Sequence, residues 1–294
     1  LLAVSLFTSQ PSVLTPQRLL PVSAVLDEGR PLLDSSLMNL LAWCWQYYKH
    51  APGEVVFSAL PPLLRKTGTS IPPPPVAYQL TPMGEQRLEE PAGRIKAQMK
   101  LLQRIGAGKG TEAELRQVSA TWRKLLDRLL EQQWVEAGNQ QPSVVSVKAG
   151  HELLDEQALA VKSIGDRLTG FHCHLLDGIT GSGKTEVYLC LLEKVLAGGG
   201  QALLLVPEIG LTPQLVKRFS NRLGFEPAVT HSGLSEGQRL QVWASARSGL
   251  ARLVIGTRSA LFLPMPDLRL MILDEEHDAS FKQQDGFRYS TRDV

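Results

Sequence analysis

Apolar positions along the chain divide it into regions of different texture. Six apolar residues recur at helical spacing between Ser35 and Lys49, which predicts a helix there. Residues 54–60 suit either a short strand or a helix, and the four consecutive prolines within 71–76 predict an extended spacer. The residues before the first helix show little periodicity and predict no element. We place this opening region at 1–76, ahead of two clearer patterns.

The region 94–138 has the pattern of a small helical module. A first helix is interrupted by a glycine-rich stretch, and Thr111 with Glu114 forms a capping box that opens a second helix. A third, strongly amphipathic helix is predicted over 122–130, and residues 134–138 suit the edge strand of a wing. We interpret the region as a winged-helix module, with a plain helical linker domain as the alternative.

Beyond residue 151 the pattern changes to short apolar segments that alternate with helices. Buried strands of the parallel kind are predicted at 171–178, 201–207, 251–257 and 268–276. Helices are predicted at 184–196, 212–223 and 235–248. This alternation predicts an α/β fold with a doubly wound parallel sheet over 151–294.

Composition narrows the class of protein. The 294 residues include 31 Lys plus Arg and 29 Asp plus Glu, so the net charge of +2 excludes an acidic or basic tail protein. Three scattered cysteines cannot form a disulfide framework and favour a reducing cytoplasm. No apolar run approaches the roughly 20 residues that cross a bilayer. The apolar start lacks Met and a basic segment, so we interpret it as a truncated or irregular beginning and not as a signal peptide.

One glycine-rich segment carries a specific chemical signal. It matches the phosphate-binding pattern G-x4-G-K-[ST] and lies between a predicted strand and a predicted helix. Its backbone N–H groups can surround phosphate oxygens, Lys184 can reach the β- and γ-phosphates, and the Thr185 hydroxyl can bind Mg²⁺. We predict ATP binding by Gly178, Ile179, Thr180, Gly181, Ser182, Gly183, Lys184 and Thr185.

An acidic pair follows the last predicted strand. Asp274 and Glu275 stand at its carboxyl end, where ligands bind in open α/β sheets. Asp274 can hold Mg²⁺, and Glu275 is the candidate general base that orients the attacking water. Alone, this segment would suit a solvated acidic loop; together with Lys184 it predicts that both segments converge on one bound nucleotide. Upstream, the amide of Gln157 could read the adenine edge, or be an ordinary surface group.

Three further segments suit contacts with nucleic acid. Two loops at strand ends offer glycines, hydroxyls, a helix N-terminus and one arginine, which suit a phosphodiester backbone, although each could be a plain loop. The third segment holds three aromatic and two cationic side chains within residues 280–289, which suits base stacking and phosphate contact; the alternative is a loop whose rings pack on the sheet. The predicted DNA-binding residues are Pro207, Glu208, Thr212, Gly256, Thr257, Arg258, Phe281, Lys282, Phe287, Arg288 and Tyr289.

Two weaker signals argue against other sites. His172 and His174 flank Cys173, but alternation within a strand would place the cysteine on the opposite face, so we do not predict zinc there. His231 follows a predicted strand and is interpreted as structural.

Several of these segments together resemble one known family. GITGSGKTEVYL, LLVPEIGLTPQ, HSGLSEGQR, VIGTRSALFLP and DEEHDASFKQQDGFRYSTRD, within 154–294, resemble the bacterial primosomal protein N′ (PriA) family of superfamily 2 replication-restart DNA helicases. YYKHAPGEVVFSALPPLL resembles the end of the family's N-terminal DNA-binding domain, and residues 94–138 occupy the place of its winged helix.

The resemblance implies a fold and a set of roles. It implies a RecA-like ATP-binding lobe, a DEEH box that includes Glu276 and His277, an adenine-contacting Gln157, and a loop from Phe281 to Tyr289 that couples DNA contact to hydrolysis. It implies 3′-to-5′ unwinding of DNA at stalled or repaired forks, with single strands and branched forks as ligands. Single-stranded DNA-binding protein and other primosome proteins would be partners, and no membrane would be involved.

The chain also departs from the family pattern. Family members continue past Val294 with a second RecA-like lobe, its arginine finger, a cysteine-rich insertion that binds Zn²⁺ and a C-terminal domain, so zinc ligands are not expected in this chain. The family's opening β-rich region is not recognisable in residues 1–24. Because such an arginine contributes about 10³–10⁵-fold in related enzymes, we expect a fragment that binds nucleotide but hydrolyses it slowly.

Other classes of protein remain as alternatives. The chain could be a non-enzymatic DNA-binding fragment that only binds nucleotide. A GTPase would need a guanine-reading N/TKxD segment, which the sequence lacks, and a small-molecule kinase would not need the segments with DNA-binding character.

Overall fold

The computed structural model describes residues 31–66, 69–73, 76–89, 96–108, 110–139, 152–179 and 181–294. Its contacts divide the chain into two units, one formed by 1–72 with 143–294 and the other by 73–142. The predicted separation of 1–76 from 151–294 therefore differs from the division that the contacts make, because the described part of the opening region packs on the α/β lobe. No helix in the described ranges is long and apolar enough to cross a membrane.

A parallel sheet forms the centre of the first unit. Four strands pair in the order β4-β5-β3-β6, and all three pairings are parallel. They are β3 (Gln201–Leu205), β4 (Ala228–Thr230), β5 (Leu253–Gly256) and β6 (Leu268–Leu273). The predicted α/β fold with a parallel sheet is confirmed.

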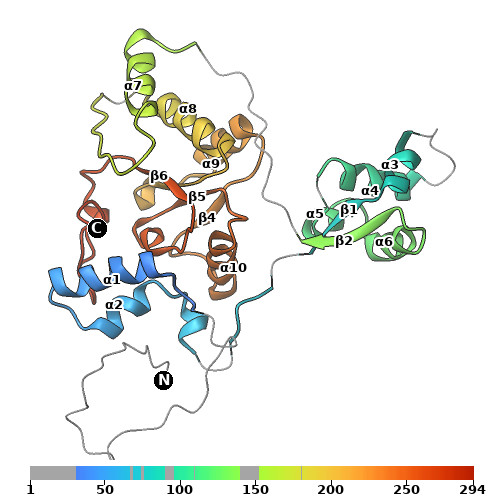
Figure 1. The fold of residues 1–294 in the computed structure, drawn as a ribbon, viewed down its shortest axis with the longest axis horizontal. Coiled ribbons are helices and arrows are strands. Elements are labelled where there is room, and N and C mark those ends of the chain that lie inside the picture. Colours follow the sequence, from blue (N-terminus) through green and yellow to red (C-terminus); the bar gives the residue numbers. More distant parts are fainter. Residues whose placement is uncertain are drawn as a thin grey trace, which may run out of the picture. The chain divides into compact units, whose positions relative to one another are not determined.

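Helices cover one face of this sheet from within the lobe. Alternate residues of β3, Ala202 and Leu204, face a core that includes side chains of α8 (Lys184–Ala197) and α9 (Pro213–Leu223). Phe219 of α9 is fully buried there. Burying one such large apolar side chain contributes roughly 1.5–3 kcal/mol, so this core holds α8 firmly against the sheet. Helix α7 (Asp155–Gly165) packs on α8 in turn (Figure 1).

The opposite face of the sheet has a mixed cover. Leu203 and Leu205 face a second core that includes α10 (Glu236–Arg247) and the 3-10 helix η5 (Arg258–Phe262). Helices α1 (Ser35–Tyr47) and α2 (Pro52–Ser58) and the 3-10 helix η3 (Pro62–Arg65) belong to the same core. Figure 1 shows α1, α2 and α10 on the side of the sheet that lies away from α8 and α9. The lobe is therefore covered in part by residues that lie more than a hundred positions earlier in the chain.

Local sequence explains where α1 and α2 begin. The Asp34 carboxylate accepts the Leu37 N–H at 2.8 Å and caps α1. Pro52 occupies the first turn of α2, where its missing N–H costs nothing. Residues 54–60, predicted as strand or helix, therefore lie mainly in α2.

The second unit combines short helices with a two-stranded antiparallel ribbon. The ribbon joins β1 and β2 with Val76 opposite Asn139. Thr111 and Glu114 form the predicted capping box, with the Thr111 N–H donating to the Glu114 carboxylate at 3.0 Å. The elements are β1 (Val76–Leu80), α3 (Pro82–Glu89), α4 (Lys96–Gly106), α5 (Glu112–Arg116), α6 (Trp122–Glu131) and β2 (Val135–Asn139). Three helices and a wing-like strand occur as predicted within 94–138, whereas β1 and α3 were not predicted.

The predicted strand at 171–178 is wrong. The structure gives this segment no strand pairing, and Phe171 and Leu175 are 93% and 81% exposed. Only Leu176 of its three large apolar side chains packs against the cores. A strand needs apolar residues on a whole face to be held at the sheet, and one leucine does not supply that face.

Candidate nucleotide site

The glycine-rich segment forms a tight turn at the start of α8. Gly181 and Gly183 both have φ of +83°, a left-handed conformation that favours glycine. A side chain at Gly183 would also approach the Gln157 amide nitrogen to 2.3 Å. The backbone conformation of the turn therefore favours glycine at both positions, and at Gly183 the approach of Gln157 also leaves no room for a side chain. Thr180 lies outside the described residues.

The Lys184 amine lies between this turn and the acidic pair. Its Nζ donates to the Gly178 carbonyl at 2.8 Å and lies 3.4 Å from Glu275 Oε1. The lysine side chain is 20% exposed and the glutamate side chain 41%. The structure thus brings together the two segments that the sequence predicts to converge.

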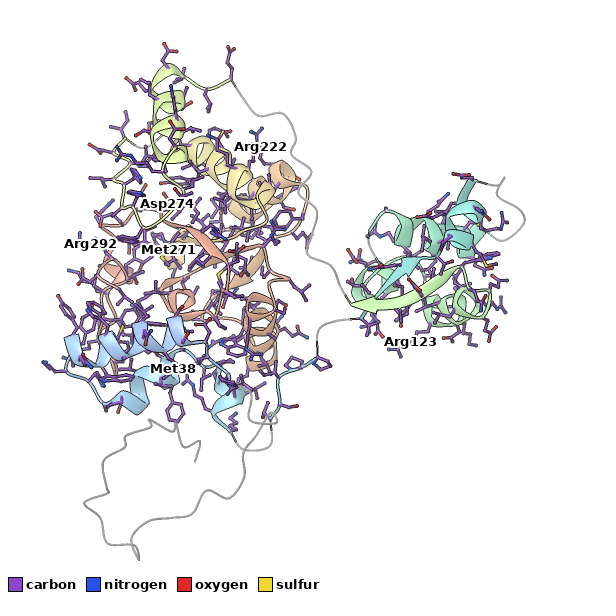
Figure 2. All side chains as sticks on the ribbon, viewed as in Figure 1. Met38, Arg123, Arg222, Met271, Asp274 and Arg292 are labelled. Atoms are coloured by element: carbon purple, nitrogen blue, oxygen red, sulfur yellow. The ribbon has the colours of Figure 1, made fainter. Side chains whose placement is uncertain are left out.

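Strand pairing places the acidic pair at the same end of the sheet. The Asp274 N–H donates to the Leu205 carbonyl at 2.9 Å, which continues the pairing of β6 with β3 by one residue. Figure 2 shows Asp274 at the end of β6, below α7 and α8. Glu275 follows with φ of +52°, a left-handed conformation that turns its carboxylate out of the strand direction. Carboxyl ends of parallel strands are where open α/β sheets bind ligands.

Tyr188 is a site residue that the sequence analysis missed. Its hydroxyl donates to Asp274 Oδ1 at 3.1 Å from a buried position on α8. Burial, aided by the negative charge of Asp274, raises the pKa of Tyr188, so the hydroxyl keeps its proton and remains a donor. Tyr188 lies one helical turn after Lys184, so the two side chains share a face of α8. That spacing was the available signal for its role.

Gln157 lies against the turn, with its amide bound within the chain. Its Nε2 donates to the Ser182 carbonyl at 2.9 Å, and its Oε1 accepts the Leu154 N–H at 3.0 Å. The amide nitrogen carries a second hydrogen and the oxygen a second lone pair, so each group can form one further hydrogen bond. The adenine contact of Gln157 stays a prediction.

The other predicted nucleotide contacts differ in exposure. Ile179 is 82% exposed, and Thr185 is half-buried in the first turn of α8. The Glu276 carboxylate pairs with Arg292 Nη1 at 3.2 Å. His277 Nε2 lies 3.7 Å from Glu275 Oε2 at an exposed position. Glu275 therefore has a cationic lysine on one side and a titratable ring on the other.

The donor set suits Mg²⁺ bound together with a nucleotide. No group of three or more His, Cys, Asp or Glu side chains in the described ranges is arranged to hold a metal ion alone. Magnesium is commonly held by one or two protein oxygens together with phosphate oxygens and water. The hydroxyl of Thr185 and the carboxylate of Asp274 are oxygen donors of that kind, so these residues fit the ion.

His172, Cys173 and His174 lie in the segment that is not a strand. Because the segment is not a strand, alternation does not place Cys173 on the opposite face from the two histidines. The two imidazole centroids are 6.3 Å apart, and Cys173 is exposed.

The first two predicted DNA-binding loops are largely engaged within the protein. The Thr212 hydroxyl accepts the Leu215 N–H at 3.2 Å as the N-cap of α9. Arg258 Nη1 donates to the carbonyls of Ser280 and Lys282 at 2.7 and 2.8 Å, so this nitrogen is engaged within the protein. The phosphate contact of Arg258 stays a prediction. The side chain of Thr257 is buried.

The remaining members of these two loops differ in their surroundings. Pro207 is buried, Glu208 is exposed, and a side chain at Gly256 would meet Thr230 Cγ2 at 2.7 Å. The glycine therefore allows β5 to lie close to β4, and no ligand is needed to explain it.

The aromatic segment, residues 280–289, packs on the lobe. Phe281, Phe287 and Tyr289 are only 2%, 6% and 7% exposed and belong to the core around α10 and α1. In this conformation the buried rings cannot stack on bases. The structure shows the alternative, in which the rings pack on the side of the sheet. Lys282 and Arg288 of the same segment are exposed, so their predicted phosphate contacts stay predictions.

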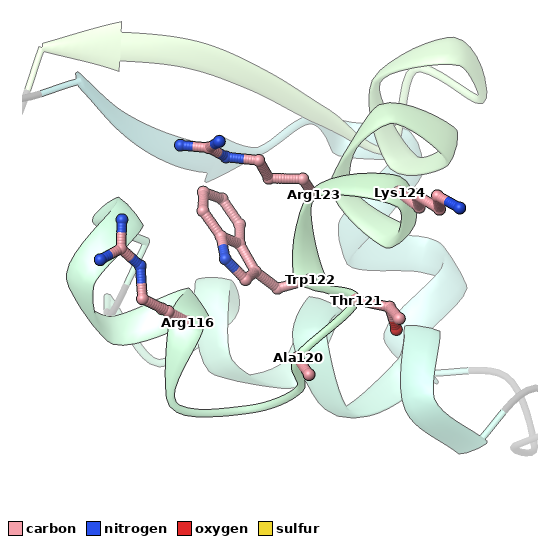
Figure 3. A pocket seen from close by; sticks show the side chains of 6 residues that line it. All are labelled: Arg116, Ala120, Thr121, Trp122, Arg123 and Lys124. Atoms are coloured by element: carbon pink, nitrogen blue, oxygen red, sulfur yellow. The ribbon is translucent and has the colours of Figure 1, made fainter.

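A basic hollow lies in the second unit. It has a volume of about 450 Å³ and is lined by Arg116, Ala120, Thr121, Trp122, Arg123 and Lys124. Figure 3 shows the Arg116 and Arg123 side chains on either side of the Trp122 ring. Arg123 also lies 3.5 Å from Glu112, which offsets part of the local positive charge.

Comparison with known protein families finds two matched regions. The family model described as DEAD/DEAH box helicase matches residues 154–294. The model described as 3′DNA-binding domain (3′BD) matches residues 3–61. The second match corrects the expectation that the family's opening region is not recognisable in residues 1–24; those residues lie outside the described part of the chain.

Curated relatives match across both regions. Replication restart protein PriA of Haemophilus influenzae is 40% identical over 274 residues, which cover 90% of this chain and 37% of that protein. The protein of the same name from Chlamydia trachomatis is 35% identical over 280 residues, which cover 89% of this chain and 36% of that protein. That of Synechocystis sp. is 53% identical over 144 residues, covering 49% of this chain and 17% of that protein.

The chain therefore spans little more than a third of the length of the first two relatives. The predicted resemblance is confirmed over the described lobe and over the opening region, by separate family models and by these relatives. The chain is related to the replication restart proteins PriA.

Proposed function

We propose that this chain contributes the ATP-binding lobe of a 3′-to-5′ DNA helicase that acts in replication restart, in primosome assembly at stalled or repaired forks. The observation that carries the proposal is the 3.4 Å approach of Lys184 Nζ to Glu275 Oε1. A turn suited to phosphate and an acidic pair suited to hydrolysis lie on either side of one lysine. The relatives named replication restart protein PriA support the helicase assignment.

The site is arranged to exchange internal partners for phosphate oxygens. Lys184 and Glu275 offset each other's charge while no phosphate lies between them. A triphosphate on the N–H groups of the turn and the start of α8 would draw the amine away from the Gly178 carbonyl. Glu275, released from its pairing, then has a free carboxylate oxygen with which to orient a water molecule.

Asp274, Thr185 and Tyr188 serve the metal side of the site. When bound, Mg²⁺ neutralises charge that develops on the phosphate oxygens. Asp274 and Thr185 supply protein oxygens for the ion. The Tyr188 hydroxyl donates to one oxygen of Asp274 and so fixes the orientation of the carboxylate. The other oxygen of Asp274 would then be available to the ion.

Nucleotide binding by the chain tests the assignment of the site. Lys184→Ala should weaken the binding of ATP with Mg²⁺ at least about 100-fold, which corresponds to roughly 2.7 kcal/mol, measured by isothermal titration calorimetry. Lys194→Ala, at the exposed far end of the same helix, is the matched control and should leave the affinity unchanged. Equal affinity in the wild type and Lys184→Ala would refute the site.

Hydrolysis tests the role of the acidic pair. Glu275→Gln keeps the size of the side chain but removes its basicity, and should lower phosphate release roughly 10²–10⁴-fold while nucleotide binding persists. The measurement is phosphate release with and without single-stranded DNA. Full turnover by Glu275→Gln would assign the base to another residue, and binding of DNA without any turnover in the wild type would favour a DNA-binding fragment.

A further inference from the structure

The aromatic segment is closed on itself by hydrogen bonds at both ends. The Gln283 N–H donates to the Tyr289 carbonyl at 2.9 Å. The Thr291 N–H and hydroxyl both donate to the Phe281 carbonyl at 3.0 Å. Arg258 adds its two bonds to the carbonyls of Ser280 and Lys282. These hydrogen bonds hold the segment as one loop, so a displacement of the residues that contact it would move the loop as a whole.

The end of α1 touches this loop at two backbone groups. The Tyr48 hydroxyl accepts the Ser290 N–H at 3.2 Å, and His50 Nε2 lies 2.9 Å from the Gly286 carbonyl. Both rings also meet Phe287 edge-on, with centroid distances of 5.8 and 5.5 Å. Such edge-to-face aromatic pairs are stabilising, so these contacts help to hold the loop.

Local geometry aims His50 at the loop. Lys49 has φ of +53°, and the His50 N–H donates to the Trp45 carbonyl at 3.1 Å, so the chain turns sharply where α1 ends. His50 Nδ1 accepts the Ala51 N–H at 2.9 Å. Nδ1 also lies 3.4 Å from Glu54 Oε2. Because a carbonyl oxygen only accepts, Nε2 is the donor in its bond to Gly286.

The far end of the loop leads to the acidic segment 274–278, which we call the acidic box. Glu276 belongs to the segment that follows β6, and its carboxylate pairs with Arg292, two residues after Ser290. The Asp278 carboxylate accepts the Ser280 N–H at 2.8 Å, which joins the acidic box to the start of the aromatic segment. A continuous set of contacts therefore runs from the end of α1 through the loop to the residues beside Glu275.

We infer that Tyr48 and His50 are positioning residues that couple DNA bound by the N-terminal region to the acidic box of the nucleotide site. The inference rests on the proposed function, because it requires both DNA binding and a working acidic box. Its basis is that residues matched by the 3′DNA-binding domain model, which ends at residue 61, contact the loop directly. A DNA ligand that shifts α1 would shift the loop and, through Arg292, the Glu276 carboxylate.

Amide hydrogen exchange at the acidic box tests this coupling without requiring turnover. The probe is a single-stranded oligonucleotide with a free 3′ end, and the readouts are the Asp274 and Asp278 amides, which donate to the carbonyls of Leu205 and Glu275. In the wild type, DNA should change their exchange rates at least about fivefold. In His50→Ala and Tyr48→Phe the change should fall below about twofold, with the DNA affinity retained.

Two further variants separate coupling from a merely structural effect. His50→Gln keeps an N–H donor for the Gly286 carbonyl and should restore part of the DNA effect. Tyr47→Phe is the matched control. It removes an exposed hydroxyl but keeps the ring that stacks on Trp43 and meets Tyr48 edge-on, so it should behave as the wild type. The β3 and β5 amides should exchange equally slowly in all the variants, which establishes that the sheet is intact.

The outcomes distinguish a failure of the proposed function from a failure of the coupling by Tyr48 and His50. If the wild type does not bind the oligonucleotide, the proposed function fails and the inference fails with it. If DNA binds and changes the acidic box equally in the wild type, His50→Ala and Tyr48→Phe, only the inference is overturned.

Discussion

The two faces of the parallel sheet are covered by different parts of the chain. The face formed by Ala202 and Leu204 meets α8 and α9, which follow the nucleotide turn and β3 in sequence. The face formed by Leu203 and Leu205 meets α10 together with α1 and α2, which precede β3 by more than 140 residues. Alternation along one strand thus directs neighbouring residues to a local and to a distant partner.

The two faces of the sheet therefore differ in which contacts stabilise them. The α8 side holds the turn and its lysine close to the sheet with contacts local to the lobe. The α10 side depends on the opening region, and the aromatic segment lies in that second core. Changes on the first side should therefore disturb the lobe alone, whereas changes on the second should also release α1 and α2.

The largest effects are expected from a matched pair of core truncations. Phe219→Ala on the α9 side and Phe262→Ala on the α10 side each remove a buried ring and should each lower the free energy of unfolding by about 3–5 kcal/mol. Urea denaturation measures the loss. Limited proteolysis should then cleave near α1 and α2 faster only in Phe262→Ala; faster cleavage there in Phe219→Ala alone would refute the division into two cores.

Thiol labelling should separate the two regions without any mutation. Cys44 of α1 is buried, and burial raises the pKa of its thiol to about 11 from 9.0. At pH 8 its reactive thiolate is then about 100-fold scarcer than that of an ordinary cysteine, whereas Cys173 is exposed.

Because the neutral thiol is the favoured form in the fold, Cys44 labelling should rise as the pH increases from about 9 toward 11. Mass spectrometry after timed labelling gives both rates. Equal rates for Cys44 and Cys173 at pH 8 would mean that α1 is not held against the lobe.

A smaller loss is expected where α10 holds α2. The buried indole N–H of Trp243 donates to the Ala59 carbonyl at 2.9 Å. Trp243→Phe leaves that carbonyl without its donor and should lower the free energy of unfolding by about 1–3 kcal/mol. Cys44 labelling should accelerate in this variant, and nucleotide affinity should not change; a change confined to nucleotide affinity would contradict the proposed cover.

The smallest effect is expected at the rim of the same face. Lys66 Nζ lies 2.8 Å from Glu236 Oε2, but their side chains are 59% and 47% exposed. Lys66→Ala should therefore lower the free energy of unfolding by less than about 1 kcal/mol, and high salt should reduce even that difference. A loss as large as that of Trp243→Phe would show that η3 is held against α10 mainly by charge.

Local patterns were sufficient to predict that the glycine-rich turn and the acidic pair lie close together. The spacing of glycines before Lys184 fixes a turn, and acids after an apolar strand must lie at the carboxyl end of the sheet. The same logic failed for 171–178, because Leu175 and Leu176 resemble the start of a buried strand although only one of them is held by the cores.

Distant packing could not be predicted in the same way. The spacing of Leu37, Leu41 and Cys44 shows that α1 buries one face, but nothing in that spacing identifies the core that receives it. Aromatic rings such as Phe287 and Tyr289 suit base stacking and core packing equally. Only the rings that pack against them, Phe262 and Tyr48, decide between the two. Arg258 likewise suits a phosphate contact, and its bonds to two carbonyls could not be predicted from the sequence.

The backbone of Glu275 has an unfavourable torsion angle that sets the direction of its side chain. Its left-handed backbone costs an L residue about 1–2 kcal/mol relative to an ordinary conformation. Glycine would remove that cost but carries no carboxylate, and an extended backbone would direct the side chain to one face of the sheet. Substitutions that relax the torsion angle are therefore expected to make the protein more stable and to move the carboxylate away from Lys184.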